Sequence, residues 1–165
     1  NYTLDTILEK ARFLVRRFGV RGIVIDPWNR LEHQIPPAMT ETNYIGACMD
    51  KLTNFAQRED VLVFIMAHPN KLKKRLGELE YDPPTGYDVA GSANFINKTD
   101  YGICVHRRKP LGYTEVHVQK VKFRHLGNTG VAKFKFNPFN GRYISINSES
   151  DPVVWEKENH LTSKN

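Results

Sequence analysis

The chain has 165 residues, 40% hydrophobic and 25% charged, which excludes a collagen-like or low-complexity disordered protein and fits a globular domain. No apolar run approaches the roughly 20 residues that span a bilayer, and no signal-peptide pattern opens the chain, so we expect a cytoplasmic protein with no membrane partner. Lysine and arginine outnumber aspartate and glutamate by 24 to 18, and the net charge of +6 suits a polyanionic partner. Cys48 and Cys104 form no CxxC pair, so we expect reduced thiols and neither a zinc site nor a disulfide.

Helices and apolar strands alternate in the first part of the chain. Residues 2–18 carry apolar side chains at helical spacing, with Thr3 as the expected N-cap and Gly19 as the expected stop. Residues 22–26 and 61–67 are apolar at nearly every position, which predicts strands buried on both faces, and 43–58 forms a helical pattern between them. This order predicts an α/β fold with a mostly parallel sheet flanked by helices.

The second part of the chain is richer in β-strand patterns. Residues 69–90 predict a long loop, and a short helix is expected around 92–97. Strands are predicted at 101–107, 115–124, 131–137 and 142–146, the last two joined as a hairpin by the Asn140-Gly141 turn. The chain becomes polar from Asn147. We therefore expect one domain over 1–147 and a polar tail over 148–165.

Two polar side chains follow the two apolar strands. Asp26 ends the first strand, and the carboxyl end of a parallel strand is where α/β sheets bind ligands. Such a carboxylate holds Mg²⁺ in nucleotide hydrolases, directly or through water. His68 ends the second strand and could bond a terminal phosphate or the attacking water. Asp26 as a cap of the next turn and His68 as a structural residue remain alternatives.

Basic residues form two further clusters of interest. Lys120, Lys122 and Arg124 alternate along a predicted strand, which places three cations on one face. They fit either an arginine finger that completes a neighbouring subunit's phosphate site or a strand edge protected by charge. The other cluster lies in the predicted long loop and fits phosphate contacts to single-stranded DNA or a solvated loop; its residues are Lys71, Lys73, Lys74 and Arg75.

Four segments in this order resemble motifs of the DnaB-type helicase family, especially its phage primase-helicase and Twinkle-like branch. Residues 23–26 look like its Walker B strand, and 65–68 look like its phosphate-sensor strand, where this branch carries His and the bacterial branch usually Gln. Residues 88–100, followed by Arg107, are similar to its DxxGSxxxxxxxD segment. Residues 122–130 are similar to its KxRxxGxxG segment, which carries the finger arginine and a nearby lysine. The resemblance covers about 22–143.

The resemblance implies a RecA-like ATPase core from a ring-shaped replicative DNA helicase. It implies ATP or another NTP with Mg²⁺ at subunit interfaces, a hexameric homo-oligomer, and single-stranded DNA bound by loops near 30–42 and 69–87. Asp26, His68, Lys122 and Arg124 would then serve as catalytic and nucleotide-binding residues, with Asp26 at the metal. We expect a phage or prophage protein in a bacterial host.

One motif of the family is missing from these residues. The 165 residues contain no GxxxxGK(S/T) phosphate loop, so we expect a piece of a longer protein that is inactive alone. Two alternatives stay open. One is a RecA-like ATPase of recombination type, and the other is a non-catalytic nucleic-acid-binding module. A phosphate loop upstream in the full-length protein would exclude the binding-only alternative.

Overall fold

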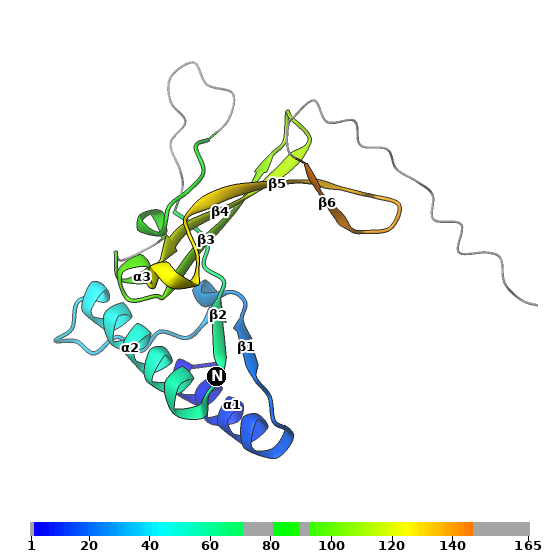
Figure 1. Cartoon of the computed structure of the whole chain (residues 1–165). Helices are drawn as coiled ribbons and strands as arrows, with labels where there is room; N and C mark the ends of the chain where they lie inside the picture. The colour runs from blue at the N-terminus through cyan, green and yellow to red at the C-terminus, as the bar shows by residue number, and fades with distance from the viewer. Residues whose placement is uncertain (1, 71–80, 90–92, 147–165) are drawn as a thin grey trace, which may run out of the picture.

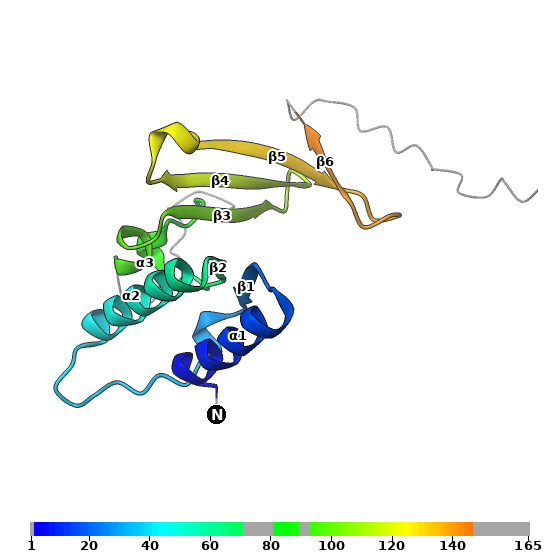
Figure 2. The ribbon, with the colours of Figure 1, turned by 60° about the horizontal axis from the view of Figure 1, so that its bottom comes forward.

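The computed structural model describes residues 2–70, 81–89 and 93–146. Helices α1 and α2 pack beside a two-stranded parallel sheet, and a four-stranded antiparallel sheet extends from the other end of the domain (Figure 1). Seen from a second side, the antiparallel strands form a separate layer from α1 and α2, with α3 between them (Figure 2). The predicted tail over 148–165 lies outside the described residues.

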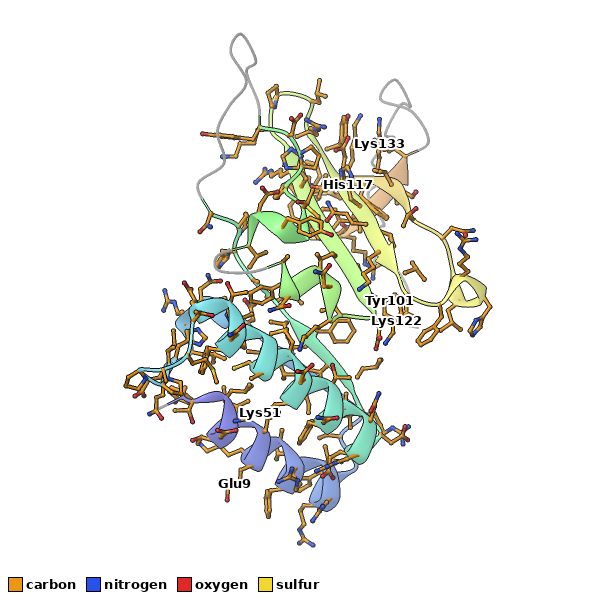
Figure 3. The ribbon with its side chains drawn as sticks, turned by 90° about the vertical axis from the view of Figure 1, so that its left-hand side faces the viewer. Glu9, Lys51, Tyr101, His117, Lys122 and Lys133 are labelled. Carbon is orange, nitrogen blue, oxygen red and sulfur yellow. The ribbon has the colours of Figure 1, made fainter. Side chains whose placement is uncertain are left out.

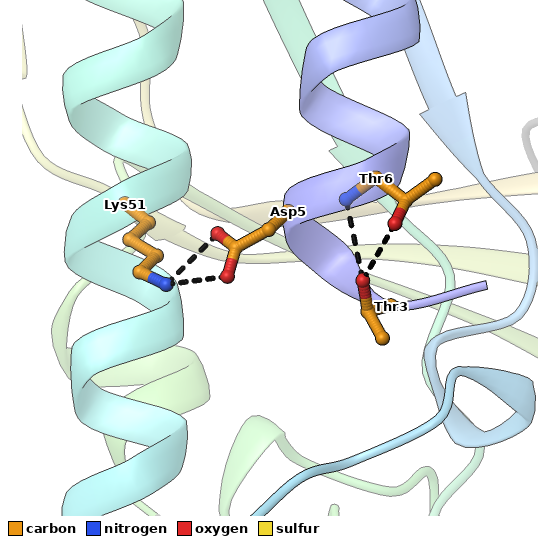
Figure 4. A network of polar contacts seen from close by, with 4 residues as sticks. All are labelled: Thr3, Asp5, Thr6 and Lys51. Atoms are coloured by element: carbon orange, nitrogen blue, oxygen red, sulfur yellow. Dashed lines mark hydrogen bonds and ion pairs between the residues drawn. The ribbon is translucent and has the colours of Figure 1, made fainter. Parts of the chain in front are cut away.

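Helix α1 (Leu4–Phe18) begins and ends where the sequence indicates. Thr3 Oγ1 accepts a hydrogen bond from Thr6 N at 3.3 Å, and Gly19 closes the helix with a φ of +67°, which glycine adopts without strain. Lys51 of α2 donates to both carboxylate oxygens of Asp5, at 2.8 and 2.9 Å, and so joins the two helices (Figure 4). The predicted helix over 2–18 is confirmed.

Strands β1 (Gly22–Ile25) and β2 (Leu62–Ile65) pair in parallel, with Gly22 opposite Leu62 and Ile25 opposite Ile65. Helix α2 (Glu41–Glu59) connects them and starts two residues before the predicted 43–58 segment, because Thr40 caps it through Asn43 N. The fully buried Met49 lies in the core that α1, α2, β1 and β2 share. The predicted order of helix, strand, helix and strand is confirmed.

The predicted burial of both strand faces is wrong for the residues that the structure describes. One face packs on the helices and contains Ile25, which is 5% exposed. The opposite face leaves Val24 61%, Leu62 63% and Phe64 46% exposed. The physical reason is that β1 and β2 pair only with each other here, and the described helices cover one face alone.

Strands β3 (Tyr101–Arg108), β4 (Tyr113–Val121), β5 (Gly130–Phe136) and β6 (Tyr143–Ile146) form an antiparallel meander in chain order. The predicted hairpin between the last two is confirmed, with Gly141 at a φ of +71° in its turn. The α/β class is also confirmed. The described strands contain one parallel pair and three antiparallel pairs, so antiparallel pairing is more extensive than the sequence indicated.

Short helix α3 (Asn94–Asn97) lies between α2 and the antiparallel sheet (Figure 2). Asn94 Nδ2 donates to the Thr42 carbonyl at 2.9 Å, and Phe95, 7% exposed, packs edge-on against Trp28 with ring centroids 5.5 Å apart. In the described part of the predicted 69–90 loop, Thr85 and Asp88 form a capping box around the 3-10 turn Gly86–Asp88. Among the described residues, no helix is long and apolar enough to cross a membrane.

Candidate functional site

Asp26 and His68 follow the carboxyl ends of the two paired parallel strands. Ile25 lies opposite Ile65, and Met66 N donates to the Ile25 carbonyl at 2.9 Å, so the backbone pairing continues into both loops. Asp26 and His68 are both exposed. The predicted placement of the two residues at one edge of the sheet is therefore observed, although their roles stay a prediction.

The loop after β1 is packed and not merely solvated. Trp28 is 3% exposed and opens the 3-10 turn Trp28–Arg30; its ring lies 4.8 Å from the His33 ring. The backbone N–H of Trp28 donates to the Met66 carbonyl at 2.8 Å, and Asn29 Oδ1 accepts from His68 N at 2.9 Å. These bonds hold the loop that carries Asp26 against the loop that carries His68.

The described residues contain no group of three or more His, Cys, Asp or Glu side chains that could hold a metal ion. Asp26 is a single exposed carboxylate at a strand end. This arrangement does not suit a metal held by protein ligands alone. It fits Mg²⁺, which keeps several waters and commonly uses one or two carboxylates together with substrate phosphates.

The predicted row of three cations on one strand face is wrong. Strand β4 ends at Val121, and Arg124 lies beyond it in the 3-10 turn Arg124–Leu126. Lys120 turns toward α3 instead, where Nζ donates to the carbonyls of Ile96 at 2.6 Å and Asn97 at 2.9 Å. Those carbonyls at the end of α3 lack helical hydrogen-bond partners and attract a cation. Lys120 therefore bonds to them and does not extend into solvent from the strand face.

Lys122 and Arg124 differ in their surroundings. Lys122 Nζ lies 2.8 Å from Asp100 Oδ1 and 5.2 Å from the Phe123 ring centroid, in an ion pair whose side chains are each nearly half exposed. Exposed pairs of this kind contribute little, so Lys122 can exchange Asp100 for a phosphate at low cost. Arg124 is exposed and forms no ion pair with the described residues. Lys71, Lys73, Lys74 and Arg75 lie outside those residues.

A cavity of about 490 Å³ lies at the other end of β4, and the sequence patterns did not point to it. Its wall combines two cations with three aromatic rings and a hydroxyl; these residues are Arg107, Lys109, Tyr113, Thr114, Phe136 and Tyr143. The rings of Phe136 and Tyr143 are 5.2 Å apart because the β5–β6 register places these residues opposite each other. Arg107 was singled out in the sequence after residues 88–100, but Phe136 and Tyr143, two of the three rings, come from β5 and β6, 29 and 36 residues after Arg107.

The cavity and Arg124 occupy opposite ends of the β3–β4 ladder. Tyr113 begins β4 and Val121 ends it, and eight steps of roughly 3.4 Å separate them by about 27 Å. In Figure 3, Tyr101 and Lys122 lie together at one end of this ladder, and Lys133 lies toward the other. One nucleotide cannot fill the cavity with its base and reach Arg124 of the same chain with its phosphates.

Buried charges lie next to the cavity wall. Glu115 is 6% exposed and contacts Arg108 Nε at 3.1 Å and His117 Nε2 at 2.9 Å. Burial alone would raise the pKa of Glu115, but the hydrogen bonds from His117 and Arg108 and the positive charge of Arg108 outweigh it and hold the pKa below its ordinary value. The side chain is therefore ionised at neutral pH and braces the strand that carries Tyr113 and Thr114.

Comparisons with known proteins found similarity to helicase-related proteins in both sequence and structure. The chain is 39% identical over 146 residues to the Twinkle homolog protein, chloroplastic/mitochondrial, of Arabidopsis thaliana, a match that covers 86% of this chain and 20% of that protein. It superposes on a DnaB-like replicative helicase, solved in a study of its interactions with primase, with a TM-score of 0.69 at 20% identity; the match covers 87% of this chain and 36% of that one. No family model matches the chain.

The chain thus spans about one fifth of the curated relative's length, and the solved helicase shares its fold. Two of the predicted motifs lie at the strands that the resemblance assigned to them, since Asp26 follows β1 and His68 follows β2. The sequence identity and the shared fold confirm the resemblance of this chain to the DnaB-type helicase family, over a segment that is similar to one fifth of a Twinkle homolog.

Proposed function

We propose that this chain forms part of a ring-shaped replicative DNA helicase that couples hydrolysis of ATP, or another NTP, to translocation on single-stranded DNA. The observation that carries the proposal is the pair of exposed polar side chains, Asp26 and His68, at the shared carboxyl end of β1 and β2. Ligands of α/β sheets bind at this edge. The relationship to a Twinkle homolog supports a nucleotide as the ligand.

Asp26 and His68 would have different roles at the phosphates of the nucleotide. Asp26 would hold Mg²⁺ through water, and the ion would neutralise the negative charge of the terminal phosphates. His68 would donate a hydrogen bond to the terminal phosphate or orient the attacking water. His68 is exposed beyond the end of β2, where a ligand at this edge of the sheet would meet it.

The cavity near Arg107 would hold the nucleobase. Base recognition combines stacking on aromatic rings with cation–π contact, and Phe136, Tyr143 and Arg107 supply both kinds of surface. Because Arg124 lies beyond the far end of β4, a strand about 27 Å long, it would reach the phosphates of a nucleotide bound by a neighbouring subunit. Lys122 would release Asp100 and bind the same phosphates as Arg124. This division of groups supports a ring, for which we propose six subunits.

The DNA contacts would come from the loops near 30–42 and 69–87. The basic cluster Lys71, Lys73, Lys74 and Arg75 suits phosphates, in contacts that are insensitive to sequence and sensitive to salt. We further propose that 1–147 forms the C-terminal part of the ATPase domain and 148–165 a separate tail. A phosphate loop would come from other parts of the parent protein, so this chain alone is not expected to hydrolyse NTP. A phage origin stays a prediction.

The proposal is tested in the full-length protein by measuring DNA-stimulated ATP hydrolysis and duplex unwinding of an Asp26→Asn variant. Loss of the metal carboxylate is expected to reduce hydrolysis by at least about 100-fold, as loss of an electrostatic group at a reacting phosphate does. Asp60→Asn is the matched control, because Asp60 is exposed, pairs among the described residues with the exposed Arg21 alone, and has a left-handed φ of 50° that asparagine tolerates. Wild-type hydrolysis by the Asp26→Asn variant would exclude the proposed function.

A further inference from the structure

The backbone ladder between β1 and β2 does not stop where the strands end. Met66 N donates to the Ile25 carbonyl at 2.9 Å. In a parallel pair the next donor on the first strand would be residue 27, but proline has no N–H. Trp28 N takes its place and donates to the Met66 carbonyl at 2.8 Å.

The following rung is made by a side chain. In a regular ladder His68 N would donate to the Pro27 carbonyl, two residues beyond Ile25. That carbonyl instead accepts from Arg30 N at 3.2 Å, which closes the 3-10 turn. Asn29 Oδ1 accepts from His68 N at 2.9 Å in its place. The asparagine therefore extends the β1–β2 pairing by one rung, up to the residue proposed to contact phosphate.

The backbone at His68, which donates to Asn29, is also restricted by the residues that follow it. Pro69 follows His68 and disfavours the helical conformation for it. Pro69 in turn forms an isolated bridge with Val89, so the chain is fixed beyond His68 as well. Beyond the bond from Trp28 N to the Met66 carbonyl, the bond from His68 N to Asn29 joins His68 itself to the loop carrying Asp26.

We propose that Asn29 is a positioning residue that sets the place of His68 relative to Asp26, and that this coupling accelerates hydrolysis without contributing to nucleotide binding. The inference rests on the proposed function of Asp26 and His68. The property that matters is an acceptor oxygen at the Oδ1 position of residue 29. A side chain of the same shape without that oxygen would leave the His68 N–H to water and let the imidazole move away from the phosphate.

Two variants of the full-length protein separate the acceptor from the shape. Asn29→Leu keeps the volume and removes the acceptor, and we expect DNA-stimulated kcat to fall about fivefold to tenfold, with KM within about twofold of wild type, as expected for loss of one net hydrogen bond acting on the reaction step. Asn29→Asp keeps the acceptor, and we expect at least half of wild-type kcat, with its added charge raising KM. Asn43→Leu makes the same replacement at an exposed position of α2 and is expected to change neither constant.

Three results would overturn the positioning role of Asn29. Wild-type kcat for Asn29→Leu, or equal losses of kcat for the Leu and Asp variants, would overturn the positioning role while Asp26→Asn is inactive. A lowered melting temperature with parallel losses of kcat and binding would make Asn29 a structural residue only, and would also overturn it. An active Asp26→Asn variant would overturn the proposed function itself, and this inference with it.

Discussion

Replacing Phe136 with alanine tests whether the cavity at the end of β4 receives a nucleobase. Phe136 is 46% exposed, and its ring packs on Tyr143 at a centroid distance of 5.2 Å. Since nearly half of the side chain faces solvent, truncation should leave the fold intact. Stacking of a base on an aromatic side chain contributes about 1–3 kcal/mol. The dissociation constant for ATP should therefore rise roughly 5-fold to 150-fold.

The assay is calorimetric titration of the full-length protein with ATP and with inorganic tripolyphosphate. Tripolyphosphate has no base, so its affinity should be unchanged in the Phe136→Ala protein. Phe139→Ala is the matched control, because Phe139 is 75% exposed in the β5–β6 turn and lies outside the cavity. Unchanged ATP affinity, or equal losses for ATP and tripolyphosphate, would refute the base-binding role of the cavity.

Three further predictions concern stability and DNA binding. Met49→Ala should lower the free energy of unfolding by about 2–5 kcal/mol in urea titrations, since Met49 is 1% exposed; a loss below 1 kcal/mol would contradict the described core. Glu115→Gln should cost about 1–2 kcal/mol at pH 7. Because the folded pKa of Glu115 lies below its ordinary value, its contribution is present above the ordinary value and lost as the pH falls through the folded value, so the variant's pH profile should be flatter there. In the full-length protein, alanine at Lys71, Lys73 and Lys74 should weaken single-stranded DNA binding and reduce its salt slope by about 0.7 per lost contact, and an unchanged slope would remove the loop from the DNA site.

The elements were predictable where local signals and burial agree. Helix α1 has an apolar stripe, the N-cap Thr3 and the stop Gly19, and all three are determined by neighbouring residues. The β5–β6 hairpin likewise follows from Asn140-Gly141. Asp26 and His68 could be placed together because the ends of parallel strands share an edge. Each of these inferences needs only the order of residues and short-range geometry.

The features that were missed depend on contacts between distant segments. Lys120 was expected on the solvent face of its strand, but the open carbonyls at the end of α3 lie within its reach. The cavity joins Arg107 on β3 to Phe136 and Tyr143 through the register of the meander, and no pattern along the chain encodes that meeting. The exposed face of β1 and β2 was missed because apolar composition indicates that a face can be buried, not which segment covers it.

The most direct test of the account mixes two inactive variants of the full-length protein and measures DNA-stimulated ATP hydrolysis. Arg124→Ala alone should lose about 1,000-fold or more of its activity, as expected for an arginine finger, and retain nucleotide binding. Asp26→Ala alone should also be inactive. If Arg124 completes the site of a neighbouring subunit, mixed rings contain interfaces with both groups intact, and part of the activity should return. Normal hydrolysis by Arg124→Ala alone, together with no recovery in mixed rings, would contradict the account.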